Sequence, residues 1–161
     1  MVAEEPEGFY EGGEKGGLYT KSGTEYATKI ISRNKSPDLS FDRSINPYKG
    51  CEHGCIYCFV RSTHNYWGLS SGQDFETHIF TKLNAVKLLR QELNRPRYQW
   101  GVGVLGSNTD PYQPIERRLK ITRGVLEELS NFNHPVAIVT KSGRCYSGLR
   151  FDFRYGKTKF G

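Results

Sequence analysis

Apolar and polar positions divide the chain near residue 39 into a polar leader and a patterned body. Residues 1–40 combine glycine with charged side chains, and their few apolar positions follow neither the strand period nor the helix period. Such a segment buries too little apolar surface to offset the entropy lost when a chain becomes ordered. We therefore predict a mostly disordered leader over residues 1–40, and we prefer a solvated tail to a specific binding arm.

Beyond residue 39, short apolar runs alternate with amphipathic stretches. We predict strands at four places in this body: 39–47, 75–81, 100–105 and 135–140. In the second of these, Phe75, Thr77 and Ile79 alternate with polar residues, whereas the last run is β-branched and suits a buried strand. Strands that alternate with helices favour an α/β fold with a parallel sheet.

Two helices are predicted between these strands. Asn84 is a candidate N-cap, because its side-chain oxygen can accept hydrogen bonds from first-turn amides, and Arg95-Pro96 ends the helix that follows. The apolar positions that define the two helix faces are Val86, Leu89 and Leu93 in the first and Ile121, Val125, Leu129 and Phe132 in the second. Residues 108–114 hold two prolines and are predicted to form a loop.

Length, termini and charge limit the class of protein. A chain of 161 residues has room for a single domain with its own core. No apolar run is long enough to cross a membrane, and the amino terminus lacks the pattern of a signal peptide, so we expect a cytoplasmic protein without a membrane partner. The net charge of +6, carried by residues beyond the leader, is compatible with a nucleic-acid partner without requiring one.

The cysteines carry the clearest chemical signal. Three of the 4 cysteines, Cys51, Cys55 and Cys58, lie in one short loop with the spacing C-x3-C-x2-C, which suits metal binding better than a disulfide framework. Thiolates this close can hold three corners of one [4Fe-4S] cluster and leave its fourth iron open to a small molecule. Gly50 and Gly54 are expected to occupy left-handed positions that let the backbone wrap around the cluster.

A zinc site is the alternative for this loop. Zinc normally requires a closed tetrahedron, for which His53, His64 or Cys145 would have to supply a fourth ligand. No second Cys or His pair stands at the usual spacing, so we prefer the iron-sulfur interpretation.

Several motifs resemble those of a known enzyme superfamily. The segments that carry the resemblance are the cysteine loop, Asn46 to Gly50, Tyr57-Cys58-Phe59, Lys82-Leu83-Asn84 and residues 108–116. Together they resemble the radical S-adenosylmethionine (radical SAM) superfamily, in the branch related to spore photoproduct lyase and DNA-repair photolyase-like proteins. The resemblance implies an incomplete (βα) partial barrel with about four parallel strands over residues 41–143.

The same resemblance implies an activity. In this superfamily the open iron binds S-adenosylmethionine, the reduced cluster cleaves it, and a 5′-deoxyadenosyl radical abstracts hydrogen from a substrate. A flavodoxin-type or ferredoxin-type protein would supply the electron. The substrate is unknown, with nucleic acid as one candidate class. Two alternatives stay open: a non-catalytic zinc or nucleic-acid-binding module, and an inactive fragment that binds a cluster.

The resemblance also suggests where S-adenosylmethionine binds. Many members carry Gly-Gly-Glu after the second strand, but this chain has Thr81-Lys82-Leu83 there, so Lys82 becomes the candidate contact. Ser107, Asn108, Thr109 and Asp110 follow the third strand, where ligands of parallel sheets gather. Thr140, Lys141 and Ser142 are weaker candidates after the fourth. The alternative for Lys82 is an ordinary surface lysine, and the alternative for residues 107–110 is a turn whose Asn and Asp side chains cap their own backbone. No catalytic residue is assigned.

The chain departs from the superfamily in two respects. Only about four strands precede residue 144, and the basic tail over residues 144–161 does not continue the pattern, so we expect the product of a truncated or frame-shifted gene. A short protein completed by a partner is the alternative. The chain also has no cysteine between Cys58 and Cys145, so repair of the spore thymine lesion is not expected.

Overall fold

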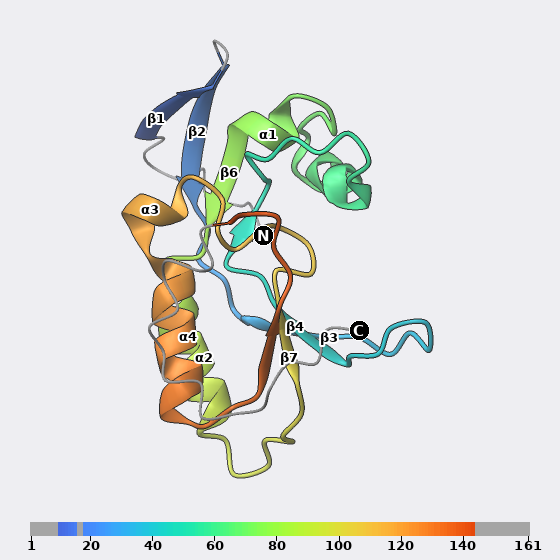
Figure 1. The fold of residues 1–161 in the computed structure, drawn as a ribbon, viewed down its shortest axis with the longest axis vertical. Coiled ribbons are helices and arrows are strands. Elements are labelled where there is room, and N and C mark those ends of the chain that lie inside the picture. The colour runs from blue at the N-terminus through green and yellow to red at the C-terminus, as the bar shows by residue number, and fades with distance from the viewer. Residues whose placement is uncertain (1–9, 16–17, 144–161) are drawn as a thin grey trace.

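The computed structural model describes residues 10–15 and 18–143, with side chains from Thr20 onward. It is a mixed α/β fold in which two four-stranded sheets stand beside a pair of helices (Figure 1). The first sheet has the order β1-β2-β6-β5, with bounds Tyr10–Lys15, Leu18–Thr24, His78–Thr81 and Tyr48–Lys49. The second has the order β3-β4-β7-β8, with bounds Ile31–Arg33, Arg43–Ile45, Gly103–Leu105 and Val136–Ile138.

Parallel pairing dominates the second sheet. β4 pairs in parallel with β7, and β7 pairs in parallel with β8, while β3 runs antiparallel along the outer side of β4. Each of the four predicted strand regions contains a strand, and three of them form this parallel group. The carboxyl ends of β4, β7 and β8 therefore meet at one edge, where residues 107–110 follow β7 and residues 140–142 follow β8.

The leader corrects our expectation of disorder. Within residues 18–40, β2 pairs in parallel with β6, and β3 pairs with β4. Ser22 and Ile30 are buried in this region. The pattern of apolar positions did not reveal these strands, because main-chain hydrogen bonds attach them to the sheets rather than a stripe of large apolar side chains. Residues 144–161, predicted to be an atypical tail, lie outside the described residues.

The first sheet also differs from the prediction of a single parallel group. β6 lies between β2, which is parallel to it, and β5, which is antiparallel to it. Residues 75–77, predicted as strand, belong instead to the short helix α1 (Asp74–Thr77). The strand prediction failed here because one turn of helix can bury alternate residues as a strand does, and α1 buries Phe75 and Thr77.

Two helices supply the main apolar contacts. α2 (Ala85–Leu93) and α4 (Ile121–Asn131) lie side by side along the molecule (Figure 1). The predicted faces are confirmed, because Leu89 and Leu129 are buried in the core. The described residues also form the 3-10 helix η1 (Phe59–Trp67) and two single-turn helices, α1 and α3 (Glu116–Leu119). Within the described ranges, each helix is too short or too polar to span a bilayer.

Asn84 precedes α2 as predicted, but its side chain acts differently. Its Nδ2 group donates a hydrogen bond of 2.8 Å to the carbonyl oxygen of Ala27, and it makes no side-chain cap hydrogen bond. The residue therefore joins the helix to the segment that follows β2 rather than satisfying the first-turn amides.

Candidate functional site

The cysteine loop begins directly after β5 and is shaped by two glycines. Gly50 has a φ of +79° and Gly54 a φ of +60°, as predicted for left-handed positions. A Cβ on Gly50 would lie 2.6 Å from the carbonyl oxygen of His78, and one on Gly54 would lie 2.5 Å from Oε2 of Glu76. Gly50 is therefore required by backbone conformation and by close packing against a main-chain carbonyl, whereas at Gly54 the conformation is the main requirement, because the Glu76 carboxylate can move.

The three thiols of the loop differ in environment. Cys51 is buried, with 7% exposure, and its amide donates a hydrogen bond of 2.9 Å to the carbonyl oxygen of Phe75. Burial raises the pKa of the Cys51 thiol to about 11. Cys55 and Cys58 are half-buried, and all three thiols are free. Metal coordination would have to lower the pKa of Cys51, because the thiolate is the ligand.

The histidines offered as zinc ligands have other contacts. Nε2 of His64 bonds with the carbonyl oxygen of His78 at 3.0 Å, and Nε2 of His53 lies 3.5 Å from Oδ2 of Asp110. Cys145 lies outside the described residues. In the described part of the chain, no three His, Cys, Asp or Glu side chains surround one metal position. A four-iron cluster takes one thiolate per iron, so its ligands need not converge in that way. The ligand role of the cysteines stays a prediction.

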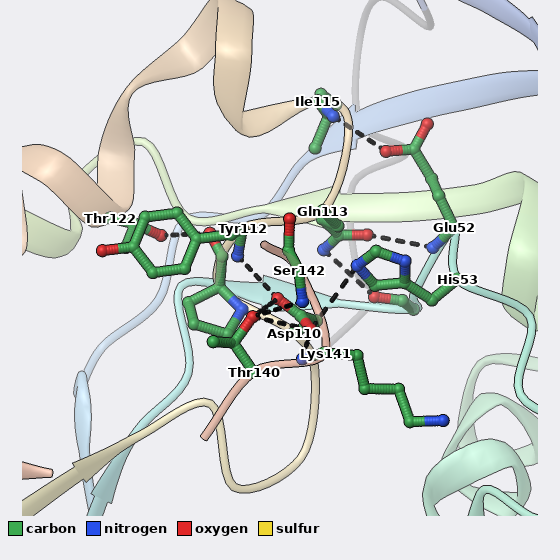
Figure 2. Close-up of polar contacts among 12 residues, drawn as sticks. Glu52, His53, Asp110, Tyr112, Gln113, Ile115, Thr122, Thr140, Lys141 and Ser142 are labelled. Atoms are coloured by element: carbon green, nitrogen blue, oxygen red, sulfur yellow. Dashed lines mark hydrogen bonds and ion pairs between the residues drawn. The ribbon is translucent and has the colours of Figure 1, made fainter. Parts of the chain in front are cut away.

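The cysteine loop is docked on the loop that follows β7. Oε1 of Gln113 accepts a hydrogen bond of 3.1 Å from the amide of Glu52, and Nε2 of Gln113 donates to the carbonyl oxygen of Gly50 at 3.4 Å. The carboxylate of Glu52 in turn accepts a hydrogen bond of 2.8 Å from the amide of Ile115 (Figure 2). Three contacts thus connect segments about sixty residues apart, which fits a parallel sheet whose loops meet at one edge.

Asp110 connects three loops, as Figure 2 shows. Its side chain is 7% exposed. It accepts hydrogen bonds of 2.8 Å from the amide of Tyr112 and the hydroxyl of Thr140, and one of 2.7 Å from the amide of Lys141. His53 approaches it from the cysteine loop. The carboxylate is thus surrounded by protein donors, which favours the self-capping alternative for this residue and gives it a role in holding the site together.

A cavity of about 450 Å³ lies beside the cysteine loop and receives several predicted residues. Lys82, Asn108 and Thr109 line it, together with Gly50 at the start of the loop. Asp110 is not among the lining residues. The cavity is large enough for a cofactor-sized ligand, since sites for small molecules commonly range from roughly 300 to 1,000 Å³.

Asn46 organises the inner wall of this cavity. Its carbonyl oxygen accepts a hydrogen bond of 2.9 Å from Nζ of Lys82, and its Oδ1 accepts one of 3.0 Å from the amide of Asn108. Its Nδ2 donates to Oγ of Ser107 at 3.2 Å. Thr109 is buried and donates to the carbonyl oxygen of Tyr48 at 2.9 Å. The predicted residues are thus brought together at the carboxyl ends of β4, β6 and β7.

Two lysines make the cavity cationic. Burial lowers the pKa of Lys82, since removing an ammonium group from water disfavours its charged form. Lys49 also lines the cavity, where its Nζ lies 2.8 Å from Oε1 of Glu25 and 4.3 Å from the centre of the Trp67 ring. The Glu25 carboxylate balances one cation, which leaves the wall suited to an anionic group.

Sequence reasoning missed several of these residues. In the sequence, Asn46 and Lys49 stand out only as members of the motif before the first cysteine, and Gln113 only as a member of the motif over residues 108–116. Their positions directly before the first cysteine and within the post-β7 loop were the available signal. Glu25 had none, because its contact with Lys49 depends on the unexpected pairing of β2 with β6.

Comparisons with known proteins give relatives without a stated activity. No family model matches the chain, and no solved structure matches it. Uncharacterized proteins of Mycobacterium tuberculosis and Mycobacterium bovis are each 41% identical over 111 residues, covering 67% of this chain and 33% of the relative. An uncharacterized protein of Methanocaldococcus jannaschii is 30% identical over 121 residues, covering 72% of this chain and 40% of the relative. The chain therefore spans about a third of the mycobacterial relatives' length.

Proposed function

We propose that the chain is a radical SAM protein of the branch related to spore photoproduct lyase, and that its fold is part of a radical SAM partial barrel. The observation that carries the proposal is the C-x3-C-x2-C loop, held at the strand ends beside a cationic cavity. The proposal extends to the activity of the whole protein, which would abstract hydrogen from a substrate that is not assigned.

Cys51, Cys55 and Cys58 would hold a [4Fe-4S] cluster. The donor set fits, since three free thiols stand in one loop whose glycines at Gly50 and Gly54 permit a tight backbone path. When bound, such a cluster supplies the electron that cleaves S-adenosylmethionine for hydrogen abstraction from a substrate. The chain's own contribution is to hold the thiols, bind the cofactor and limit access of water.

S-adenosylmethionine would bind in the cavity beside this loop. Lys82 would pair with its carboxylate, because its partly buried ammonium group lines the cavity and donates to the neutral carbonyl oxygen of Asn46. Asn108, which lines the cavity, would contact the ribose or the amino-acid part, while Ser107 would act from behind through its hydrogen bond with Asn46. Tyr66, 89% exposed at the cavity wall, offers a ring on which the adenine can stack.

A zinc module is the rival interpretation. It is less well supported, because His64 already bonds with the carbonyl oxygen of His78, and because no three His, Cys, Asp or Glu side chains of the described residues surround one metal position. His53 would be the remaining nearby candidate, since its Nε2 lies 3.5 Å from Oδ2 of Asp110 without a hydrogen bond. A nucleic-acid substrate has weaker support, from the positive net charge and from exposed aromatic side chains near the cysteines, among them Tyr57 and Phe59.

Anaerobic reconstitution tests the proposal. The chain should take up about four iron and four sulfide ions, and with dithionite or a reduced flavodoxin it should release methionine and 5′-deoxyadenosine from S-adenosylmethionine. Cys55→Ala should lose the cluster, whereas Cys145→Ala, outside the motif, should keep it. Stoichiometric zinc without cleavage would refute the proposal. A stable cluster without cleavage would refute its catalytic part.

A further inference from the structure

Gln113 grips the main chain on both sides of Cys51. Its amide nitrogen donates to the carbonyl oxygen of Gly50, and its amide oxygen accepts from the amide of Glu52, so the two peptide groups that flank Cys51 are bound by a single side chain. Gln113 has 0% exposure. We propose that Gln113 is a positioning residue that fixes the orientation of the Cys51 thiol. Its consequence for the cluster rests on the function proposed above.

The geometry leaves Cys51 little freedom. Besides the two contacts with Gln113, the amide of Cys51 itself donates to the carbonyl oxygen of Phe75 at 2.9 Å. Cys51 follows Gly50, which holds a φ of +79° and, because it has no Cβ, has more backbone conformations available to it than other residues have. The two hydrogen bonds of Gln113 to Gly50 and Glu52, called the clamp from here on, restrain the backbone at this point. With the clamp in place, the direction of the Cys51 thiol depends mainly on rotation about its Cα–Cβ bond.

A glutamine is chemically suited to this clamp. Its planar amide offers one donor and one acceptor at a fixed separation, which match the outward carbonyl of Gly50 and the outward amide of Glu52. The loop that carries Gln113 is itself braced. The main-chain carbonyl oxygen of Gln113 accepts a hydrogen bond of 3.0 Å from the amide of Glu116, and the amide of Ile115 donates a hydrogen bond to the carboxylate of Glu52.

The clamp also decides where one amide donor points. Because Gln113 binds the Glu52 amide, that N–H group is not available to the sulfur of Cys51 or of a bound cluster. N–H donors directed at cluster sulfurs influence the reduction potential. Gln113 would therefore influence the potential without touching the cluster, and its loss would change both the mobility of Cys51 and the hydrogen bonding around it.

Alkylation of the apoprotein tests the clamp without any cofactor. Iodoacetamide labelling followed by mass spectrometry gives the rate at each cysteine, and the rate at Cys51 is compared with that at Cys58. Gln113→Met, which keeps the length and removes both polar groups, should raise this ratio by roughly 10-fold, the effect of one lost buried hydrogen bond. Thr122→Val is the matched control, because it removes a buried 2.7 Å hydrogen bond to Pro111 in the same loop without touching the cysteine loop.

An unchanged ratio in Gln113→Met, or an equal rise in Thr122→Val, would overturn the clamp. If Gln113→Met fails to fold by circular dichroism, Gln113→Asn replaces it, since the shorter amide keeps its polarity but cannot reach both partners. Its ratio is then judged by the same criterion.

Reconstitution extends the test to the cluster. Gln113→Met should lose the cluster roughly 10-fold faster than the unmodified chain, because second-shell changes commonly cost 10- to 100-fold in metal affinity, and its midpoint potential should move while that of Thr122→Val does not. An unchanged potential and lifetime in Gln113→Met would overturn the positioning role. An unmodified chain that forms no cluster would refute the proposed function instead, while the alkylation result would still decide the clamp.

Discussion

The ammonium group of Lys82 donates a hydrogen bond of 2.9 Å to the main-chain carbonyl of Asn46, which joins the end of β6 to the segment that enters the cysteine loop. Asn46 also holds Asn108 and Ser107 through its side chain. Asn46, which precedes the cysteines, therefore connects the candidate cofactor residues that follow β6 and β7.

Replacing Lys82 should weaken cofactor binding. Lys82→Met keeps most of the side-chain volume but removes the charge, so the affinity of the reconstituted chain for S-adenosylmethionine should fall by roughly 10-fold or more. Isothermal titration under anaerobic conditions measures this affinity. Lys87→Met, an exposed lysine on α2, should leave it unchanged. Equal affinities in the two variants would remove Lys82 from the binding site.

Gly50 should tolerate alanine far less well than Gly68. Both have positive φ angles, +79° and +68°, so each alanine costs about 1–2 kcal/mol for the left-handed conformation. At Gly50 the new Cβ would also meet the His78 carbonyl at 2.6 Å, whereas at Gly68 nothing lies within 4 Å. Urea denaturation should therefore show a clearly larger loss for Gly50→Ala. Similar losses would mean that the backbone around Gly50 yields easily.

Glu116 should contribute to stability through its buried carboxylate. It accepts hydrogen bonds from the hydroxyl of Tyr48 and from the amides of Thr122 and Arg123, at the start of α4. Glu116→Gln replaces one acceptor oxygen by a donor, so the free energy of unfolding should fall by about 2 kcal/mol.

The matched control for Glu116 is Glu127→Gln. Glu127 forms an exposed ion pair with Arg123, which commonly contributes less than about 1 kcal/mol. Urea unfolding followed by circular dichroism compares the two variants, and a small effect at Glu116 would show that the helix start is satisfied in another way.

Acid should destabilise the fold through two buried histidines. Burial lowers the pKa of His64 and of His134 below their usual value of 6.5. As the pH falls through about 6.5, the unfolded chain therefore binds more protons than the folded chain. The free energy of unfolding then becomes smaller as the solution becomes more acidic. Urea titrations at several pH values between about 5 and 7.5 measure the slope, which His134→Gln should reduce. An unchanged slope would exclude His134 as a source.

Local patterns predicted the elements whose burial follows a regular period. α2 and α4 show it well, because their apolar positions fall on one face and Leu89 and Leu129 are buried as expected. The left-handed glycines of the cysteine loop were predicted because only a few residue types tolerate that conformation. The gathering of Asn108, Thr109 and Lys82 at strand ends followed from the general behaviour of parallel sheets.

Contacts between distant segments were beyond that reasoning. β2 has no apolar stripe to reveal it, and it exists through its pairing with β6. Gln113 and Glu25 look like ordinary loop residues in the sequence, since their importance comes from partners about sixty and twenty-five residues away. The exchange of a predicted strand for α1 over residues 75–77 has a local origin instead, because one turn of helix can bury alternate residues as a strand does.

The parallel pairing of β2 with β6 also bears on how the chain folds. Lys21 pairs with His78, so the two strands are separated in sequence by the entire cysteine loop. Contacts this distant form slowly, because a long stretch of chain must close before they gain any stability. During synthesis the three thiols therefore leave the ribosome before the strand that completes their support, which exposes them to oxidation at the stage when the scaffold protects them least.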